Sequence, residues 1–531
     1  MVKNWTLILL CLWNLSIYAQ LSPNQLRDYI ANNKSINKDV KNFYTQIKYQ
    51  TAWTKIENQH NYKALQDAIS HCSAMGLSES DYSIKSSAII SKDSSTKKIK
   101  IDTLETELLL TATAIKFYND IAYGNKKPSF GYNGLKIEKD GKNVTGLLVK
   151  HISNNNLHQL INQLTTRLPE ITVIENTIKK YLAILAENGF QEQKILQAKL
   201  ITSNLPLISK LYQLGIIESN NAVLTDSLLK VKIKEVQLQF NQLPDGIIRT
   251  PLLNELNVPI QIRLQQLNLS LNYYKWLTCA IQNQKAIVVN IPAANLKVYN
   301  KDFTILEMKM IVGKKSTPTP TLTSTVEEVI LYPYWHVPYS IAIKELLPII
   351  KRNPGYIHTG NYQVLNKAGS IIDPYSINWQ LLNKGNFPYL IRQSTGCDNA
   401  LGLLKLNFNN PFGVYLHDTP VKSLFKLNKR YLSHGCMRME KPNEIGHLVL
   451  SNNPQAIDTL EQKGCLRNQS PIKVSADEKL PVIVWYNPVG IESTGHLVFY
   501  EDIYEKFNWV KKNSELNYPK KYNGNPQPLI R

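Results

Sequence analysis

The segment of this sequence with the clearest chemical potential is Ser433-His434-Gly435-Cys436, which begins sixteen positions after His417. A cysteine attacks a carbonyl carbon only as the thiolate, so it needs a neighbour that lowers its pKa or removes its proton, and histidine is the usual one. The glycine lets a substrate approach the backbone closely. The amides of Gly435 and Cys436 can then point at a developing oxyanion. The pattern predicts a thiol nucleophile with a histidine base.

Two other interpretations of this cluster have to be weighed. At average residue usage, Ser-His-Gly-Cys arises by chance in fewer than about one chain in a thousand of this length, so accident explains it poorly. Zinc is the stronger rival, because His417, Asp418, His434 and Cys436 are all of zinc-ligand type. Neither HExxH nor CxxC accompanies them, so we expect no metal. A buried structural cysteine beside unrelated histidines is the remaining alternative.

The elements that must position these residues are strands. From Lys285 onward, alternating and β-branched runs predict strands joined by turns. His417 directly follows a predicted strand at 412–416, and it meets Cys436 if the two segments are neighbours in one sheet. Residues 339–385 are typical of helix and loop, interrupt the strand pattern and are expected to form a lid. The runs "LPVIVWYNPVG" and "GHLVFYEDIY" predict a hairpin near the end of the chain.

The first 200 residues are predicted to be mostly helical. Ser22 before Pro23, with Gln25 three positions after the serine, is typical of a capping box at a helix start. Cys72 falls on the apolar face of a later helix that Gly76 ends, so it is expected in the core. A further apolar-periodic helix is predicted at 103–122.

Residues 224–276 predict a helix, a turn at Pro244-Asp245-Gly246 and a second short helix. This segment resembles a small three-helix peptidoglycan-binding module in the pieces Val236-Gln237, Asp245 to Ile248 and Leu253 to Asn257. It departs from that pattern at Arg249 and Leu252. A purely structural helical spacer is the alternative, because a DG turn between helices is common.

The first 19 residues predict a signal peptide. Lys3 precedes an apolar run from Trp5 to Leu15, and the small Ala19 stands just before Gln20. A membrane anchor is the alternative, but the run is shorter than the roughly 18 residues of a spanning helix, and no later segment could span a bilayer. We therefore expect an exported protein of the periplasm or cell envelope.

Charge and cysteines fit an exported protein. The formal charge is +20, or +19 once the signal peptide has taken Lys3 away. The lysines are spread along the chain instead of forming short basic runs, so nucleic acid is not an expected partner, whereas a carboxylate-rich wall polymer is. With Cys11 removed, an odd number of cysteines remains, so at least one thiol stays free. These are Cys72, Cys279, Cys397, Cys436 and Cys465.

Around Cys436 the chain resembles the catalytic signature of the L,D-transpeptidases, the YkuD-type cysteine enzymes of bacterial cell walls. There a histidine is followed, after a spacer, by Ser/Thr-x-Gly-Cys, a hydrophobic residue and often Arg. Here His417 is followed by residues 418–432, the Ser-His-Gly-Cys segment, Met437 and Arg438. The large multidomain branch is resembled by "YPYWHVPYSIAIKELLP", "YLIRQSTGCDNALGLLKLNF", "VYLHDTPVKSLF" and "RYLSHGCMRMEKP", and more loosely by "NFYTQIKYQTAW". One departure is Ser394-Thr395-Gly396-Cys397, where that branch has Pro before Gly.

The resemblance implies roles for the site residues. Cys436 is the expected nucleophile and His417 its base, with the Gly435 and Cys436 amides in the oxyanion hole. Ser433 and His434 are expected to shape the loop.

Three further residues have expected roles at the site. Arg438 either holds the loop or binds a stem-peptide carboxylate. Tyr415, two residues before His417, is expected to be a wall residue on the same face. Asn399 is expected to form a turn rather than to touch substrate.

The implied reaction is acyl transfer in cell-wall organisation. The Cys436 thiolate attacks the carbonyl of the third stem-peptide residue, expels the terminal D-alanine, and passes the acyl group to the side-chain amine of a second stem, which cross-links peptidoglycan. The expected partners are stem peptides, with carbapenem β-lactams as covalent inhibitors, and no cofactor is needed. An L,D-carboxypeptidase or other cysteine hydrolase of the same fold, with water as acceptor, stays open. So does a non-catalytic peptidoglycan-binding scaffold.

The expected fold class is a multidomain α+β protein. Its parts are a signal peptide (1–19), an α-helical scaffold (20–205), a small three-helix module (206–278), a mostly β catalytic domain (279–510) with a helical lid (339–385), and a tail (511–531).

Overall fold

The computed structural model describes residues 21–83, 90–92, 99–101, 103–136, 142–165, 168–196, 203–281 and 284–507. These residues form two compact units. Met1–Lys126 and Lys139–Arg167 belong to the first, and Lys127–Glu138 and Leu168–Arg531 to the second. The predicted signal peptide and C-terminal tail lie outside the described residues.

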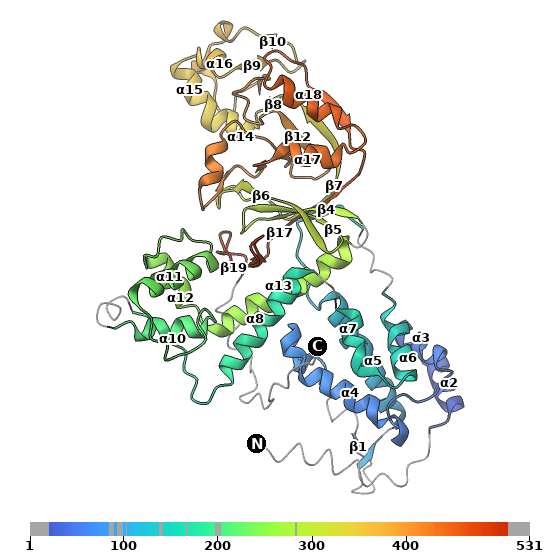
Figure 1. Cartoon of the computed structure of the whole chain (residues 1–531). Helices are drawn as coiled ribbons and strands as arrows, with labels where there is room; N and C mark the ends of the chain where they lie inside the picture. Colours follow the sequence, from blue (N-terminus) through green and yellow to red (C-terminus); the bar gives the residue numbers. More distant parts are fainter. Residues whose placement is uncertain are drawn as a thin grey trace. The chain divides into compact units, whose positions relative to one another are not determined.

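The first unit is helical, as predicted (Figure 1). Its first helix begins with the expected capping box between Ser22 and Gln25. Cys72 is fully buried, and Gly76 ends its turn in the left-handed conformation. The short strand pair β1–β2 (Ile90–Lys92 and Ile99–Ile101) was not predicted. The helices are α2 (Pro23–Asn32), α3 (Lys38–Gln46), α4 (Gln59–Ser70), α5 (Thr103–Tyr123), α6 (Val144–Ser153) and α7 (Leu160–Leu164).

A buried carboxylate organises the core of this unit. Glu107 of α5 has no exposed surface, and its oxygens accept hydrogen bonds from the amides of Ala52, Trp53 and Thr54 at 2.5, 3.3 and 3.0 Å. The Thr54 hydroxyl also donates to it, at 2.8 Å. Glu107 thus takes the place of a backbone partner for the turn at 52–54, whose amides would otherwise be buried without an acceptor.

Replacing Glu107 with leucine is therefore expected to destabilise this unit by at least about 2 kcal/mol, because each buried amide left without an acceptor costs about 1–3 kcal/mol. Hydrogen exchange measured by mass spectrometry should show protection lost at residues 52–54. Glu107→Gln, which keeps one acceptor oxygen, is the matched control and should lose less protection. Unchanged exchange in the leucine variant would contradict this role.

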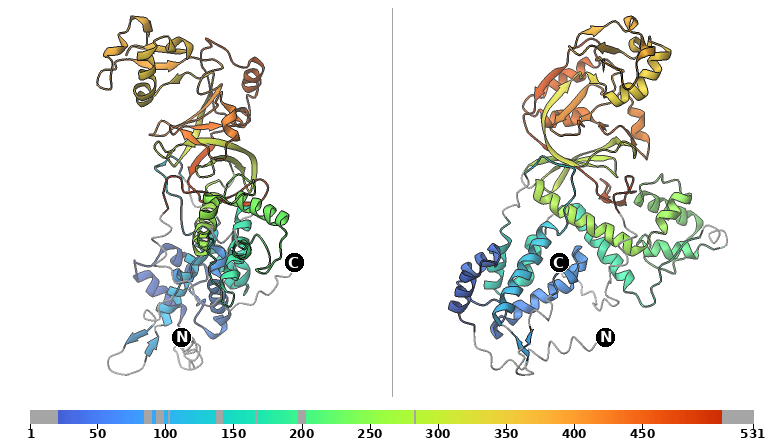
Figure 2. Two further views of the ribbon diagram at one scale, coloured as in Figure 1. Left: turned by 90° about the vertical axis from the view of Figure 1, so that its left-hand side faces the viewer. Right: turned by 180° about the vertical axis from the view of Figure 1, so that it is seen from behind.

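The helical part of the second unit is α8 (Pro169–Leu185), α10 (Leu205–Gln213), α11 (Asp226–Gln239), α12 (Thr250–Leu256) and α13 (Ile260–Ile281). The long helices α8 and α13 lie side by side (Figure 1 and Figure 2). The predicted helix, turn and short helix are confirmed, with Gly246 at a φ of +79°.

The predicted boundary at 205 is wrong. Apolar side chains from Leu168 onward pack in one core with α10 to α13 and with the short hairpin of β18 (Val489–Ile491) and β19 (Leu497–Phe499). Arg263 of α13 shows this connection, because its guanidinium contacts the rings of both Phe240 and Phe499, 4.6 and 4.7 Å from their centroids. The segment 206–278 is thus part of a larger helical body with a shared core.

The main sheet of the second unit has the order β12-β13-β15-β6-β5-β4-β17-β7-β16, and β12 also pairs with β7, so the order closes on itself as in a barrel. Its inner face is a core of aliphatic and methionine side chains. The predicted terminal hairpin is wrong in one respect: β17 joins this sheet beside β4 and β7, and the hairpin is β18–β19. The strands are β4 (Lys285–Asn290), β5 (Asn295–Asn300), β6 (Phe303–Gly313), β7 (Leu322–Leu331), β12 (Leu404–Phe408), β13 (Leu416–His417), β15 (Met437–Met439), β16 (Ile472–Ser475) and β17 (Pro481–Trp485).

Residues 335–393 form a subdomain with a small sheet of order β10-β9-β11-β8 and a hydrophobic core of its own. The prediction of helix and loop for 339–385 is wrong for β9 and β10, because strands of four and two residues are too short to show an alternating pattern. The strands are β8 (Trp335–His336), β9 (Tyr362–Leu365), β10 (Ile371–Ile372) and β11 (Leu390–Gln393), and the helical pieces are α14 (Tyr339–Ile341), the π-helical turn η6 (Ala342–Leu346), α15 (Leu347–Arg352) and α16 (Tyr356–Thr359).

No helix among the described residues combines the length and apolar character needed to cross a bilayer.

Candidate active site

The strand segments that carry His417 and Cys436 are neighbours, which is the condition set by the sequence analysis for the two residues to meet. β13 and β15 pair in parallel, with Leu416 opposite Met437 and His417 opposite Arg438. Leu416 and Met437 point into the core. Because successive side chains alternate between the two faces of a strand, His417 and Arg438 lie on the other face. The strand before His417 is shorter than the predicted 412–416, since β13 begins only at Leu416.

The imidazole of His417 is held in its neutral form. Its side chain is 4% exposed, and Nδ1 donates a hydrogen bond to the Asp418 carbonyl oxygen at 2.5 Å. This bond places the ring proton on Nδ1 and leaves Nε2 as the acceptor. Burial and then the charge of Arg438 lower the pKa of His417 to about 3, the hydrogen bond to Asp418 opposes them, and the charge of Lys405 adds a smaller lowering. The imidazole is therefore unprotonated at neutral pH.

Cys436 is half-buried, and its thiol is surrounded by donors and cations. Burial raises the pKa of the thiol, while hydrogen bonds from the amide and hydroxyl of Tyr415 and the charges of Lys405 and Arg438 act in the opposite direction. The Tyr415 hydroxyl in turn accepts a hydrogen bond from Trp335 of β8. Tyr415 is thus a direct partner of the thiol, which is more than the wall position expected for it.

The loop before Cys436 is shaped by Ser433. Its hydroxyl donates to the Cys436 carbonyl oxygen at 2.6 Å and accepts from the Gly435 amide at 3.1 Å. Gly435 has a φ of +118°, which favours glycine. The expected oxyanion role of the Gly435 amide does not fit this arrangement, because Ser433 already occupies that donor. The Cys436 amide, by contrast, has no hydrogen-bond partner within the part of the chain that the structure describes.

His434 connects this loop to the 335–393 subdomain. Its Nε2 lies 2.7 Å from Oε1 of Glu345 in η6. Turns of π-helix are often found at functional sites. No sequence pattern could have revealed this pair, because the two residues belong to distant segments that only the fold brings together.

Asn399 has the contacts of a turn former. It is fully buried, its Nδ2 donates to the carbonyl oxygens of Pro333 and Ser394, and its Oδ1 accepts from the Leu401 amide at 2.8 Å. All its hydrogen-bonding groups are thus used by nearby backbone, which agrees with the expected turn.

A disulfide joins Cys397 to Cys465, while Cys72, Cys279 and Cys436 are not part of a disulfide. The disulfide holds the Ser-Thr-Gly-Cys loop that lacks the proline expected from the family. Asn361 adds a hydrogen bond from its Nδ2 to the Thr395 carbonyl oxygen at 2.9 Å. Together these contacts fix the loop without proline.

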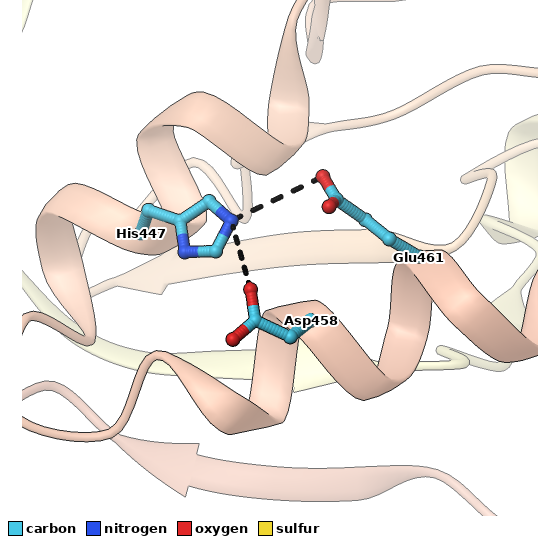
Figure 3. Close-up of side chains that lie close together, drawn as sticks. All are labelled: His447, Asp458 and Glu461. Carbon is cyan, nitrogen blue, oxygen red and sulfur yellow. Dashed lines mark ion pairs between the residues drawn. The ribbon is translucent and has the colours of Figure 1, made fainter.

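The residues considered as zinc ligands from the sequence differ from those whose potential ligand atoms lie close together in the structure. Across the described ranges, the group of His, Cys, Asp and Glu side chains with ligand atoms within 4.8 Å of one another is His447, Asp458 and Glu461 (Figure 3). They lie on α17 (Pro442–Val449) and α18 (Gln455–Lys463), where His447 forms ion pairs of 3.7 and 4.0 Å with the two carboxylates. These ion pairs account for the cluster.

A family model of the L,D-transpeptidase catalytic domain (YkuD) matches residues 284–457, the range that holds both His417 and Cys436. The chain carries an L,D-transpeptidase catalytic domain. A Scaffold domain model matches residues 38–170, within the helical region.

One curated relative supports this assignment. A protein of Haemophilus influenzae, provisionally named an L,D-transpeptidase, is 35% identical over 218 residues, which are 41% of this chain and 44% of that protein. The chain thus spans less than half the length of this relative.

Solved L,D-transpeptidases resemble the chain only weakly. The enzyme from Mycobacterium smegmatis is 16% identical, with 38% of this chain and 58% of that chain covered and a TM-score of 0.17. L,D-transpeptidase 3 from Mycobacterium tuberculosis, in complex with a faropenem-derived adduct, is 14% identical, with coverage of 38% and 61% and a TM-score of 0.20. At these scores the assignment rests on the family model and the sequence relative.

The lowered pKa of His417 predicts the pH dependence of the thiol. The imidazole stays neutral from pH 5 to 8, so its protonation should not limit reactivity there, whereas the raised thiol pKa should make reactivity increase with pH above neutrality. The rate of Cys436 alkylation by iodoacetamide, measured between pH 5 and 9, checks this. His434→Gln, which changes the other histidine of this region and keeps His417, is the matched control. An inflection near pH 6.5 that persists in that variant and disappears in His417→Asn would contradict the assignment.

Proposed function

We propose that this protein is an exported peptidoglycan L,D-transpeptidase in which Cys436 is the nucleophile and His417 the base. The parallel register of β13 and β15 carries the proposal, because it places a base of defined tautomer and a hydrogen-bonded thiol on one face of the sheet.

In the acylation half, the thiol proton of Cys436 passes to Nε2 of His417 and the sulfur attacks the carbonyl carbon of the third stem-peptide residue. The Cys436 amide stabilises the oxyanion. The carbon–nitrogen bond to the terminal D-alanine then breaks, and His417 returns the proton to the leaving amine. A thioester on Cys436 and free D-alanine result.

In the transfer half, the side-chain amine of a second stem attacks the thioester carbon. His417 accepts the amine proton and returns it to the departing sulfur, which restores the thiol. The product is an amide between the third residues of two stems. If water attacks instead, the same site is an L,D-carboxypeptidase, so the acceptor depends on how well water is excluded.

Other parts of the chain fit this function. A net charge of +20 suits a polymer rich in carboxylates. The scaffold domain and the helices around 206–278 are proposed to hold the protein on the wall. Carbapenems are expected to acylate Cys436, because their strained lactam carbonyl is an acyl donor.

Incubation of the protein with disaccharide-tetrapeptides, followed by mass spectrometry, tests the proposal. Dimers joined through their third residues, with one D-alanine released per dimer, are expected. Tripeptides and D-alanine without dimers would identify a carboxypeptidase. EDTA should leave activity intact and iodoacetamide should remove it. No product, together with unimpaired binding to isolated cell wall, would support the non-catalytic scaffold instead.

A further inference from the structure

Two cations stand on either side of His417 on the face of the sheet that carries the thiol. Lys405 of β12 lies opposite His417, and His417 lies opposite Arg438 of β15. The neighbours of Lys405 and Arg438 along their strands point into the core. Because residues opposite one another share a face, Lys405, His417 and Arg438 form one row across three strands.

No carboxylate among the described residues forms an ion pair with either cation. Within the described ranges, no carboxylate oxygen lies within 4.0 Å of the side-chain nitrogens of Lys405 or Arg438, and the Lys405 Nζ contacts the Tyr415 ring at 4.0 Å from its centroid. The acidic residue closest to Lys405 in the register is Glu328 of β7, whose carboxylate accepts from Asn407 at 2.5 Å instead. Both cations are half-buried, and burial lowers the pKa of each.

Other buried cations of the second unit do contact a carboxylate. A charge removed from water is normally stabilised by a partner of opposite charge. In each of the following pairs a buried cation contacts a carboxylate directly: Lys210 with Glu192, Arg263 with Glu255, and Lys297 with Glu170. Arg430, which is buried without a carboxylate, donates instead to backbone carbonyl oxygens such as those of Met310 and Ala294. Among the described residues, the side-chain nitrogens of Lys405 and Arg438 donate to neither a carboxylate nor a backbone carbonyl, although both charges act on the thiol. This indicates that the missing anion belongs to the ligand.

The position of the two cations relative to the thiol defines where that anion lies. Both act electrostatically on Cys436, and Lys405 rests on the Tyr415 ring whose hydroxyl bonds the thiol. An extended peptide advances about 3.3–3.6 Å per residue. A carboxylate on the residue that follows the attacked carbonyl therefore lies about one residue length from the sulfur, in the region where both charges act.

We propose that Lys405 and Arg438 form a carboxylate subsite that binds the free α-carboxylate of the leaving residue. The site then accepts donors whose attacked carbonyl lies one residue from a free C-terminus and disfavours donors in which that carboxylate is blocked. This inference rests on the proposed function, since it assigns the donor end of the same site. Lys405 is its new specificity residue.

Acylation of Cys436 by two donors tests the subsite. One is a stem tetrapeptide with a free C-terminal carboxylate, the other its C-terminal carboxamide, and intact-mass spectrometry follows a single turnover. The wild type should prefer the acid by about a hundredfold, because charge-assisted hydrogen bonds to a carboxylate are strong. Lys405→Met should lose most of this preference, because its acylation by the acid should become slower while its acylation by the amide stays unchanged. Lys405→Arg should recover the preference.

Lys473→Met is the matched control. Lys473 lies on β16 opposite Ile330, and Ile330 also lies opposite Lys405. The Lys473→Met variant therefore removes a positive charge from the same row of side chains. The Lys473 side chain is exposed, and the preference for the acid should be unchanged. Thermal unfolding and iodoacetamide reactivity establish that each variant is folded with an accessible thiol.

The outcomes separate the two proposals. Equal wild-type rates with acid and amide would overturn the subsite and leave the proposed function standing. Lys405→Met slowing both donors and iodoacetamide equally would also overturn it, because Lys405 would then only stabilise the thiolate. A wild type that neither donor acylates would overturn the proposed function and the subsite together.

Discussion

Replacing Cys436 with alanine is expected to abolish D-alanine release and cross-linking, with a loss of at least about 10⁴-fold. Covalent catalysis requires the sulfur. The neighbouring hydroxyl groups of Tyr415 and Ser433 are engaged in hydrogen bonds and do not replace it as a nucleophile. The fold should survive, because Cys436 lies at the edge of the core and the change removes one sulfur atom. Circular dichroism and thermal unfolding measure that part of the expectation.

Intact-mass spectrometry with a carbapenem gives the decisive measurement. The wild type should gain one adduct and Cys436→Ala none. The other free thiols, Cys72 and Cys279, are buried, so Cys279→Ala serves as the matched control and should still gain one adduct. An adduct that survives in Cys436→Ala would mean that another group is the nucleophile.

The candidate nucleophile Cys436 and the candidate base His417 could be identified from the sequence, because a short motif carries the cysteine and a predicted strand ends at the histidine. Their adjacency depends on the pairing of β13 with β15. The start of the first helix, capped by Ser22, and the turn at Gly246 could also be predicted, since capping and turn residues act locally. The helix start and the turn each depend on residues within a few positions of one another.

The rest of the site depends on pairings between distant segments. Lys405 became visible only through the register of β12 with β13, and Glu345 only through the packing of η6 near His434. Helical periodicity likewise could not tell which core α8 would join, so the boundary at 205 was misplaced. Local sequence patterns determine where helices and strands form, whereas the pairing and packing of these elements depend on distant segments of the chain.

Excising the 335–393 subdomain is expected to turn transfer into hydrolysis. The subdomain contacts the site through Glu345 at His434 and through Trp335 at Tyr415, so it is placed to exclude water from the thioester. Without it, Cys436 should still be acylated, but water should compete with the acceptor amine. Tripeptides should then replace cross-linked dimers as the main product.

The strand register makes a clean excision possible. His336 pairs with Arg392, and the Val337 amide donates to the Ile391 carbonyl oxygen at 2.9 Å, so the two ends of the segment already meet. Residues 338–390 can be replaced by Asn-Gly, a favoured two-residue hairpin turn. Trp335 is retained and can still donate to Tyr415.

The matched control is Glu345→Gln, which keeps the subdomain and removes only the charge that faces His434. If the subdomain acts by covering the site as a body, which its own hydrophobic core favours, this variant should keep most cross-linking. If the ion pair alone holds the cover closed, Glu345→Gln should resemble the excision. An excised protein that is folded, is acylated by a carbapenem and forms dimers and tripeptides in the wild-type ratio would show that the subdomain is only a packing element.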